Sequence, residues 1–266
     1  MSKYLATVAK SGQVNTPPGS YLTVKEWARN AFMDRWSTLL EIGCSTGFIS
    51  IEMARYVGAT CVGLDLHEGS IAAARQNVDR HVAHLLSFQQ GDAGKLPFAD
   101  GQFSHVVVSG HLPFIPPEER RGHVIEALRV VKPWGYLLTA LYHYRTPPPE
   151  ALVEEFNAKI GTRLSPDGTK AYWAGLFDEL PLTLEYETEY EAVPADEVRA
   201  HQYVGRMRPE TRDDWKEYVR LFNENGRFLN YSVRVHRKIP AEPDLMLQIP
   251  RGGIYGVRRK PDGGMR

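Results

Sequence analysis

The sequence has little cysteine and no apolar run long enough to cross a bilayer. Two cysteines among 266 residues, Cys44 and Cys61, cannot form the multi-disulfide framework of a small secreted domain, and they lack the spacing of a zinc site. A membrane-spanning helix needs about 20 consecutive apolar residues, and residues 1–12 lack the apolar segment of a signal peptide. We therefore expect a cytoplasmic protein with buried thiols, without a bound metal and without a membrane partner.

The sequence also lacks an excess of charge of either sign. It contains 32 Lys and Arg residues against 32 Asp and Glu residues, so its formal net charge is zero. General nucleic-acid binders depend on a positive excess. Positive charge gathers mainly in residues 251–266, which we interpret as a solvated C-terminal tail. These features favour a small-molecule substrate over nucleic acid and leave a homodimer open.

Apolar runs typical of strands alternate with helical spacing through the first half of the chain. Such alternation predicts a parallel sheet with helices on both faces, and strands that are apolar throughout fit a sheet covered on both sides. Strands are expected at 38–43, 60–66, 86–90, 103–109 and 136–142, and helices at 22–34, 48–57, 69–79 and 117–131.

This rhythm changes after Arg145, where Pro147–Pro149 interrupt the chain. Residues 150–180 and 195–225 have interrupted helical spacing, whereas 182–191 and 228–236 alternate as half-exposed strands do. We expect an α/β fold with a doubly wound, mostly parallel seven-stranded sheet, an antiparallel closing strand and a helical cap. The expected parts are an N-terminal lid or helix (1–35), a core (36–145), a cap with the sixth strand (146–220), a closing helix end and last strand (221–239), and a tail (240–266).

A turn of small residues, Glu41 to Gly47, joins the first strand to the next helix. Glycines let a ligand approach the backbone, and a helix N-terminus offers free N–H donors. Gly43 and Gly47 stand four residues apart, which differs from the G-x-G-x-x-G turn of dinucleotide-binding proteins. Taken alone, the turn could also be a plain strand-to-helix connection.

Two carboxylates follow at the ends of the next two strands. Asp65 stands 18 residues after Gly47 (65 − 47), where a carboxylate can accept both hydrogen bonds of a ribose diol. The alternative role for Asp65 is a helix N-cap. Asp92 lies in the segment Gly91-Asp92-Ala93-Gly94-Lys95-Leu96-Pro97-Phe98, for which the alternative is a capped turn.

Together these segments resemble the class I S-adenosylmethionine-dependent methyltransferases, and among them the small-molecule enzymes of the methyltransferase type 11 kind. The turn resembles their E/D-x-G-x-G-x-G motif, with Ser45 in place of the central glycine. Residues 91–98 resemble their G-D-A-x-x-L-P-F segment. Residues 126–137 resemble L-R-V-L-K-P-G-G-x-L, with Trp134 at a usual glycine. The resemblance implies a Rossmann-like fold, S-adenosyl-L-methionine as cofactor and S-adenosyl-L-homocysteine as product.

The resemblance also implies roles for individual residues. Gly43 and Gly47 would let the methionine end of the cofactor approach the backbone, and Glu41 would support the loop or the cofactor amino group. Asp92 would accept from the adenine amino group, and Leu66 would line the adenine pocket. The expected cofactor-binding residues are Glu41, Gly43, Cys44, Ser45, Gly47, Asp65, Leu66, Asp92, Ala93 and Ser109.

Three residues are candidates for catalysis. His111 follows the fourth strand, His143 follows the fifth strand, and Tyr21 follows the turn Pro17-Pro18-Gly19. Imidazole titrates near neutral pH and can act as a general base. A structural role is the alternative for His111. Three segments are expected to lie over the site: the N-terminal segment to Trp27, the loop after Ser109, and residues 145–220. Aromatic residues are frequent in all three, where they would exclude water or form the core of the cap.

The predicted function is methyl transfer to N, O or C of a small molecule, of an aromatic or natural-product type. One alternative is a protein that binds S-adenosylmethionine without catalysis, as a scaffold. Another is a protein or nucleic-acid methyltransferase. The fourth strand is followed by Ser109-Gly110-His111-Leu112 and not by an N/D-P-P-Y motif, which weighs against methylation of nucleic-acid bases.

Overall fold

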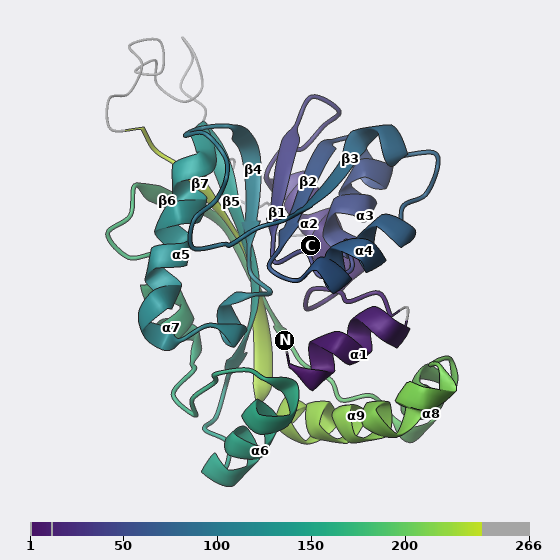
Figure 1. Ribbon diagram of the computed structural model, residues 1–266. Helices are drawn as coiled ribbons and strands as arrows, with labels where there is room; N and C mark the ends of the chain where they lie inside the picture. The colour runs from purple at the N-terminus through teal and green to yellow at the C-terminus, as the bar shows by residue number, and fades with distance from the viewer. Residues whose placement is uncertain (1, 12, 241–266) are drawn as a thin grey trace, which may run out of the picture.

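A computed structural model describes residues 2–11 and 13–240. Its strands form one seven-stranded sheet in the order β3-β2-β1-β4-β5-β7-β6 (Figure 1). The expected mostly parallel seven-stranded sheet is confirmed. The strands are β1 (Thr38–Ile42), β2 (Thr60–Asp65), β3 (Leu86–Gln90), β4 (Phe103–Val108), β5 (Val131–Tyr144), β6 (Leu182–Glu191) and β7 (Leu229–Lys238).

The order in which strands are added to the sheet reverses at β1, in the centre of the sheet. β1 pairs in parallel with β2 on one side and with β4 on the other, so that Leu40 lies opposite both Val62 and Val106. β7 pairs antiparallel with β5 and with β6, as expected for a closing strand. In open parallel sheets a ligand binds beyond the carboxyl ends of the strands where the strand order reverses. The fold therefore places a site beyond the ends of β1 and β4.

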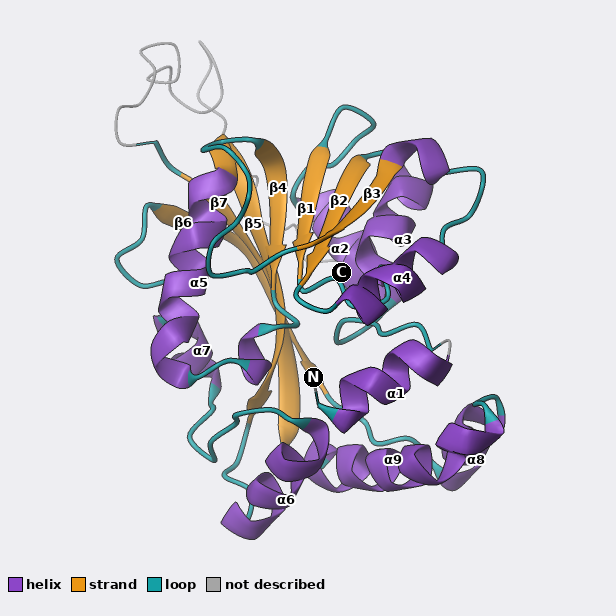
Figure 2. Cartoon of the chain, viewed as in Figure 1, coloured by secondary structure: helices purple, strands orange, loops and turns teal. Residues whose placement is uncertain are grey.

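Helices cover both faces of the sheet, and a second group lies beyond one end of it (Figure 2). α5 and α7 pack on one face, and α2, α3 and α4 on the other. The helices are α1 (Lys3–Ser11), α2 (Tyr21–Asn30), α3 (Phe48–Val57), α4 (Glu68–Gln76), α5 (Pro117–Val130), α6 (Glu150–Ile160), α7 (Lys170–Gly175), α8 (Glu197–Gly205) and α9 (Arg212–Gly226), with short 3₁₀ turns at Ala83–Leu85, Leu112–Phe114 and Pro209–Thr211.

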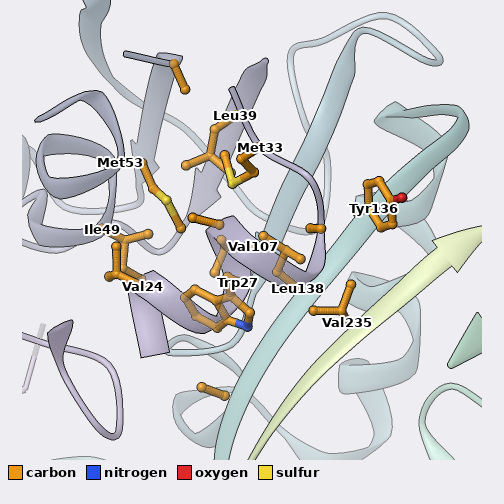
Figure 3. Close-up of a cluster of buried hydrophobic side chains, with 14 of the residues drawn as sticks. Val24, Trp27, Met33, Leu39, Ile49, Met53, Val107, Tyr136, Leu138 and Val235 are labelled. Carbon is orange, nitrogen blue, oxygen red and sulfur yellow. The ribbon is translucent and has the colours of Figure 1, made fainter. Parts of the chain in front are cut away.

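Successive residues of the central strands belong alternately to two separate hydrophobic cores, one on each face of the sheet. Leu39 of β1 and Leu138 of β5 pack with Trp27 of α2 on one face (Figure 3). Leu40 and Leu137, their neighbours in sequence, belong to the core under α5 and α7. Side chains of a strand point alternately to its two faces, so these apolar strands are buried on both sides. This double burial makes the sheet a rigid platform for the site.

The helices beyond the end of the sheet form a cap with its own core. Tyr4 and Val8 of α1 are buried there with Phe156 of α6, Trp215 and Leu221 of α9. The sequence predicted a cap from residues after 145, and it treated the first twenty residues as polar. α1 lies in the segment expected as an N-terminal lid or helix (1–35), and the structure shows that it belongs to the cap although residues 12–149 separate it from α6.

Element boundaries differ from expectation at a few places. α2 ends at Asn30 and not at residue 34, because Phe32 has φ 52°. β5 begins at Val131, directly after α5, and not at residue 136, and its pairing with β4 is irregular between Phe103 and His105. Trp134 has φ 63°, a backbone conformation that suits glycine, and Arg237 lies over its ring. The expected tail from residue 241 onward lies outside the described residues.

Candidate active site

The turn after β1 is held by backbone hydrogen bonds to the end of β2. The N–H groups of Gly43 and Cys44 both donate to the carbonyl of Leu64, at 2.8 and 3.0 Å. Gly43 has φ 70° and Gly47 has φ 81°, in the left-handed region that glycine adopts without steric cost. A side chain at residue 43 would also meet His111, whose Cβ would lie 2.7 Å from the added Cβ. Both glycines are therefore required by the backbone path of the turn.

Asp65, the last residue of β2, joins this turn to the next one. Its Oδ2 accepts from the Ser45 N–H and its Oδ1 from the His67 N–H, both at 2.9 Å. His67 is the residue before α4, so Asp65 does not act as the N-cap residue of that helix. A carboxylate offers about four acceptor positions, so Asp65 can accept two further hydrogen bonds.

Glu41 lies one residue before the end of β1 and is buried behind the turn. Its Oε2 accepts from the N–H of Ser50 at 2.8 Å and from the Ser50 hydroxyl at 2.6 Å. Burial raises the pKa of Glu41 to about 7, although the hydrogen bonds from Ser50 lower it. Glu41 thus ties the turn to the first turns of α3 and can change its charge near neutral pH.

A cavity of about 460 Å³ lies between the ends of β1, β4 and β5 and the cap. It reaches the turn at Glu41–Ser45 and extends under α1, α6 and α9. Most of its wall is apolar and aromatic, and the described lining residues include no lysine or arginine. The aromatic lining residues are Tyr4, Phe114, Tyr142, Tyr144, Phe156, Trp173, Tyr203 and Phe222.

Comparison with known proteins identifies the family. A family described as a methyltransferase domain matches residues 39–135. The ubiquinone/menaquinone biosynthesis C-methyltransferase UbiE of Pseudomonas entomophila is 30% identical over 61% of this chain and 58% of its own length. The demethylmenaquinone methyltransferase of Desulfitobacterium hafniense is 35% identical over 38% of this chain and 41% of its own length.

The crystal structure of MccD protein matches 84% of this chain and all of that chain, with a TM-score of 0.73 and 26% identity. Residues 39–135 therefore form a methyltransferase domain, and the described fold is that of the class I S-adenosylmethionine-dependent methyltransferases. The chain spans about half the length of the two named methyltransferase relatives.

The cofactor residues predicted for this methyltransferase lie along neighbouring strand ends, in two groups. Glu41, Gly43, Cys44, Ser45 and Ser109 line the cavity. Gly47, Asp65, Leu66, Asp92 and Ala93 lie outside it, in the turn after β1 and at the ends of β2 and β3.

The chemistry of these residues fits S-adenosyl-L-methionine, the cofactor of the family. Asp65 keeps two acceptor positions for a ribose diol, and Leu66, which is 57% exposed, offers an apolar surface beside it. Asp92 is exposed, and its Oδ1 accepts from the Gly94 N–H at 2.8 Å, which leaves Oδ2 available for an amino group. The ribose and adenine would thus lie at β2 and β3, and the methionine end at the cavity.

Of the candidate catalytic residues, His111 lies next to the cavity but does not line it. It begins the turn after β4, and its ring lies 5.5 Å from that of His123. Both ring nitrogens are buried without a hydrogen-bond partner in the described residues. Burial lowers the pKa of His111 to about 3, so the ring is neutral. In this position His111 packs against the Gly43 turn, and its role as a base stays a prediction.

The other two candidates differ in position. His143, near the end of β5, lines the cavity and is 3% exposed. Tyr21, the first residue of α2, lies outside the cavity with 54% of its surface exposed, and its ring packs against Phe48. The structure therefore brings His143, but not Tyr21, to the space that an acceptor would occupy.

Residues 15–18 belong to the N-terminal segment that was expected over the site, but their contact with the cofactor turn was not expected. These residues line the cavity, and Asn15 contacts the cofactor turn twice. Its N–H donates to Thr46 Oγ1 at 2.9 Å, and its side-chain amide donates to Ser45 Oγ at 3.3 Å. A pair of prolines at 17 and 18 was visible as a turn, but no local pattern shows which distant loop a turn will contact.

Other expectations concern metals and membranes. Within the described residues no group of three or more His, Cys, Asp or Glu side chains could hold a metal ion. His81 and His84, which are close in sequence, are both exposed. Across 2–11 and 13–240, none of the helices combines the length and apolarity that a bilayer requires. Cys44 and Cys61 are free and buried, as expected.

Proposed function

We propose that this methyltransferase transfers a methyl group to a small, uncharged and largely apolar or aromatic molecule held in the cavity. The observation that carries the proposal is the cavity itself, which opens on the cofactor turn at one side and is covered by the cap. Small-molecule sites are concave, mostly apolar and lined by a few polar groups. A cavity of about 460 Å³ has the size of such a site.

The charges of the wall support an uncharged acceptor. Besides the tyrosines and the Cys44 thiol, the ionisable lining residues are Glu41 and His143. Burial raises the pKa of Glu41 and lowers that of His143, so in each group burial disfavours the charged form. A phosphate or carboxylate on the acceptor would find no lysine or arginine in the described lining, and burying an unpaired charge costs several kcal/mol. We therefore expect the cavity to reject anionic acceptors.

The relatives support an aromatic acceptor class. Two of them are named for methylation in menaquinone or ubiquinone synthesis, and eight aromatic side chains line the cavity here. When bound, S-adenosyl-L-methionine supplies a methyl group on a positively charged sulfur. The residues of this chain position the acceptor and exclude water, which lets proximity supply much of the rate.

A methylation assay with matched acceptors tests this proposal. The protein is incubated with labelled S-adenosyl-L-methionine and pairs that differ in charge but keep the same free hydroxyl, such as 2-naphthol with 6-hydroxynaphthalene-2-sulfonate, and methyl 6-hydroxy-2-naphthoate with 6-hydroxy-2-naphthoate. We expect S-adenosyl-L-homocysteine release with neutral members and at least tenfold less with their anionic partners. Equal turnover of both members would contradict the charge argument.

The two alternatives make different predictions in the same assay. A scaffold would bind S-adenosyl-L-homocysteine in calorimetry yet turn over no acceptor. A macromolecular methyltransferase would label RNA, DNA or protein in a cell extract more than the low-molecular-weight fraction.

A variant of the cavity wall gives a second test of the proposal. Phe156→Ala should raise the KM for 2-naphthol, while Phe32→Ala, a solvent-exposed control, leaves it unchanged.

A further inference from the structure

His143 has an unusual environment for a buried histidine. Its Nε2 lies 2.9 Å from the Ser232 hydroxyl and 3.9 Å from Oε1 of Glu189. Its Nδ1 is also buried but has no partner in the described residues. Most buried polar atoms are hydrogen-bonded. His143 is among the residues that line the cavity, and an acceptor bound there would supply the partner that this nitrogen lacks among the described residues.

Glu189, on β6, is held in place from two sides. The Asn230 amide donates to its Oε1 at 2.6 Å, and the Lys170 ammonium lies 3.0 Å from its Oε2. These hydrogen bonds, from Asn230 first and Lys170 second, lower the pKa of Glu189. The carboxylate is therefore ionised at neutral pH and cannot turn away from His143 without losing both donors.

A fixed carboxylate beside one ring nitrogen selects the tautomer of the histidine. A negative charge 3.9 Å from Nε2 favours a proton on that nitrogen, and Nε2–H can then donate to the Ser232 hydroxyl. Nδ1 is left with its lone pair. Carboxylates act in this way on many functional histidines.

We propose that His143 Nδ1 is the general base for an acceptor with an acidic hydroxyl group, and that Glu189 is the residue that positions and polarises it. This inference rests on the proposed function, because it places the acceptor in the same cavity. It narrows the acceptor class to phenol-like hydroxyls, whose oxygen must lose a proton to become a good nucleophile. An amine acceptor that arrives neutral would not require a base.

The proton and electron pairs balance in one displacement. The acceptor O–H bond breaks and its proton goes to Nδ1 of His143. The oxygen lone pair forms the new bond to the methyl carbon, and the bond from that carbon to sulfur breaks with both electrons remaining on sulfur. The imidazolium of His143, stabilised by Glu189, then releases its proton to solvent.

Charged groups on three elements act on His143. Burial, Arg234 of β7 and Lys170 of α7 lower the pKa of His143, whereas Glu189 and Glu187 of β6 raise it. The base form is therefore present at neutral pH, and activity should be lost at acid pH as Nδ1 takes up a proton. Removing the Glu189 carboxylate should lower this pKa further and weaken the base.

Nitrogen NMR of the histidine side chains tests the tautomer without any activity. Spectra of the ¹⁵N-labelled protein saturated with S-adenosyl-L-homocysteine are compared with those of His143→Gln, which assigns the resonances of His143. We expect a proton on Nε2 in the free protein and a shift of the Nδ1 resonance when 2-naphthol is added. A proton on Nδ1, or an Nδ1 resonance that 2-naphthol leaves unchanged, would overturn the proposal.

Turnover of acceptors of graded acidity tests the proton transfer. We expect His143→Gln to lower kcat for 2-naphthol by about 100-fold, in the range of general base catalysis, and to lose less than about tenfold with cyano-substituted 2-naphthols that ionise readily. An equal loss across the series would show a structural role and contradict the proposal. If the normal protein methylates none of these acceptors, the proposed acceptor class fails, and the NMR result still decides the tautomer.

Glu189→Gln separates positioning from simple support of the fold. We expect kcat to fall about tenfold with an unchanged KM, and the acid limb of kcat/KM to move about 0.5–1 unit to lower pH. Glu191→Gln is the matched control, because Glu191 lies two residues along the same strand and pairs with Arg145 at the surface. An unshifted acid limb in Glu189→Gln would exclude the positioning role, provided that both variants keep normal thermal unfolding and S-adenosyl-L-homocysteine affinity.

Discussion

The carboxylate of Asp65 accepts a 2.9 Å hydrogen bond from the N–H of Ser45, and this contact joins the carboxyl ends of β1 and β2. The residue expected to hold the ribose is thus also a support of the turn that approaches the methionine end. Binding of the two halves of the cofactor should be coupled through this one side chain.

Replacement of Asp65 should therefore affect the cofactor strongly. Asp65→Ala removes the acceptor of the Ser45 and His67 N–H groups together with the ribose ligand. A hydrogen bond to a charged group contributes about 1.5–3 kcal/mol, so the Kd for S-adenosyl-L-homocysteine should rise roughly 100-fold or more. Isothermal calorimetry measures this change, with the surface variant Asp213→Ala as control. An unchanged Kd in Asp65→Ala would refute the assignment of this residue.

The Gly43 turn offers a test by second-site rescue. Gly43→Ala places a Cβ at 2.7 Å from the Cβ of His111 on a backbone with φ 70°, and strain of this kind costs on the order of 1–3 kcal/mol. We expect weaker S-adenosyl-L-homocysteine binding and a lower free energy of unfolding. His111→Gly in the same chain removes the clash and should restore part of both losses. Strictly additive effects in the double variant would show that the two residues do not compete for space.

Glu41 should make stability depend on pH. Burial raises the pKa of Glu41 to about 7 in the folded protein, above its unfolded value of about 4.5. Between these values the folded state holds a proton that the unfolded state has released, so this group destabilises the fold as pH rises from about 4.5 to 7. The effect should reach at most about 3 kcal/mol.

Denaturant unfolding at pH 5 and pH 7.5 measures this dependence. Glu41→Gln lacks the titrating group, while its amide oxygen can still accept from Ser50. We expect the difference in unfolding free energy between variant and normal protein to grow in favour of the variant at pH 7.5. A difference that is the same at both pH values would argue that Glu41 is ionised throughout.

Arg120 should anchor the cap to the loop after β4. Its buried guanidinium donates to the carbonyls of Leu112 and Arg163 and to the Tyr172 hydroxyl, and it lies over the ring of Trp173. Within the described residues it has no carboxylate partner. Arg120→Met leaves these acceptors unpaired and should cost about 2–4 kcal/mol of stability.

Thermal unfolding and hydrogen exchange of the Leu112–Phe114 turn would measure the effect of Arg120→Met. The exposed Arg199→Met is the control and should change stability by less than about 0.5 kcal/mol. Normal stability and normal protection in Arg120→Met would mean that water replaces the lost donors.

The amino-acid sequence was enough to predict the sheet and to propose the cofactor loop. Five strands alternating with helices, and two alternating strands after them, were enough to predict seven strands, because apolar runs buried on both faces are a local pattern. The turn from Glu41 to Gly47 and the residues Asp65 and Asp92 were assigned to the cofactor from their resemblance to family motifs and their places at strand ends, and these roles stay predictions.

Long-range packing determines which of the candidate catalytic residues lines the cavity. His111 and His143 are equivalent as sequence features, each following a strand, yet His143 lines the cavity and His111 packs behind the glycine turn. Glu189, which lies 3.9 Å from His143, is 46 residues away along the chain (189 − 143). Such contacts depend on the antiparallel pairing of β5, β7 and β6 and on the packing of the cap, including α1, and no local pattern encodes them. Short-range periodicity therefore predicted the scaffold and motif resemblance proposed the cofactor site, whereas long-range packing selected the candidate base and the shape of the cavity.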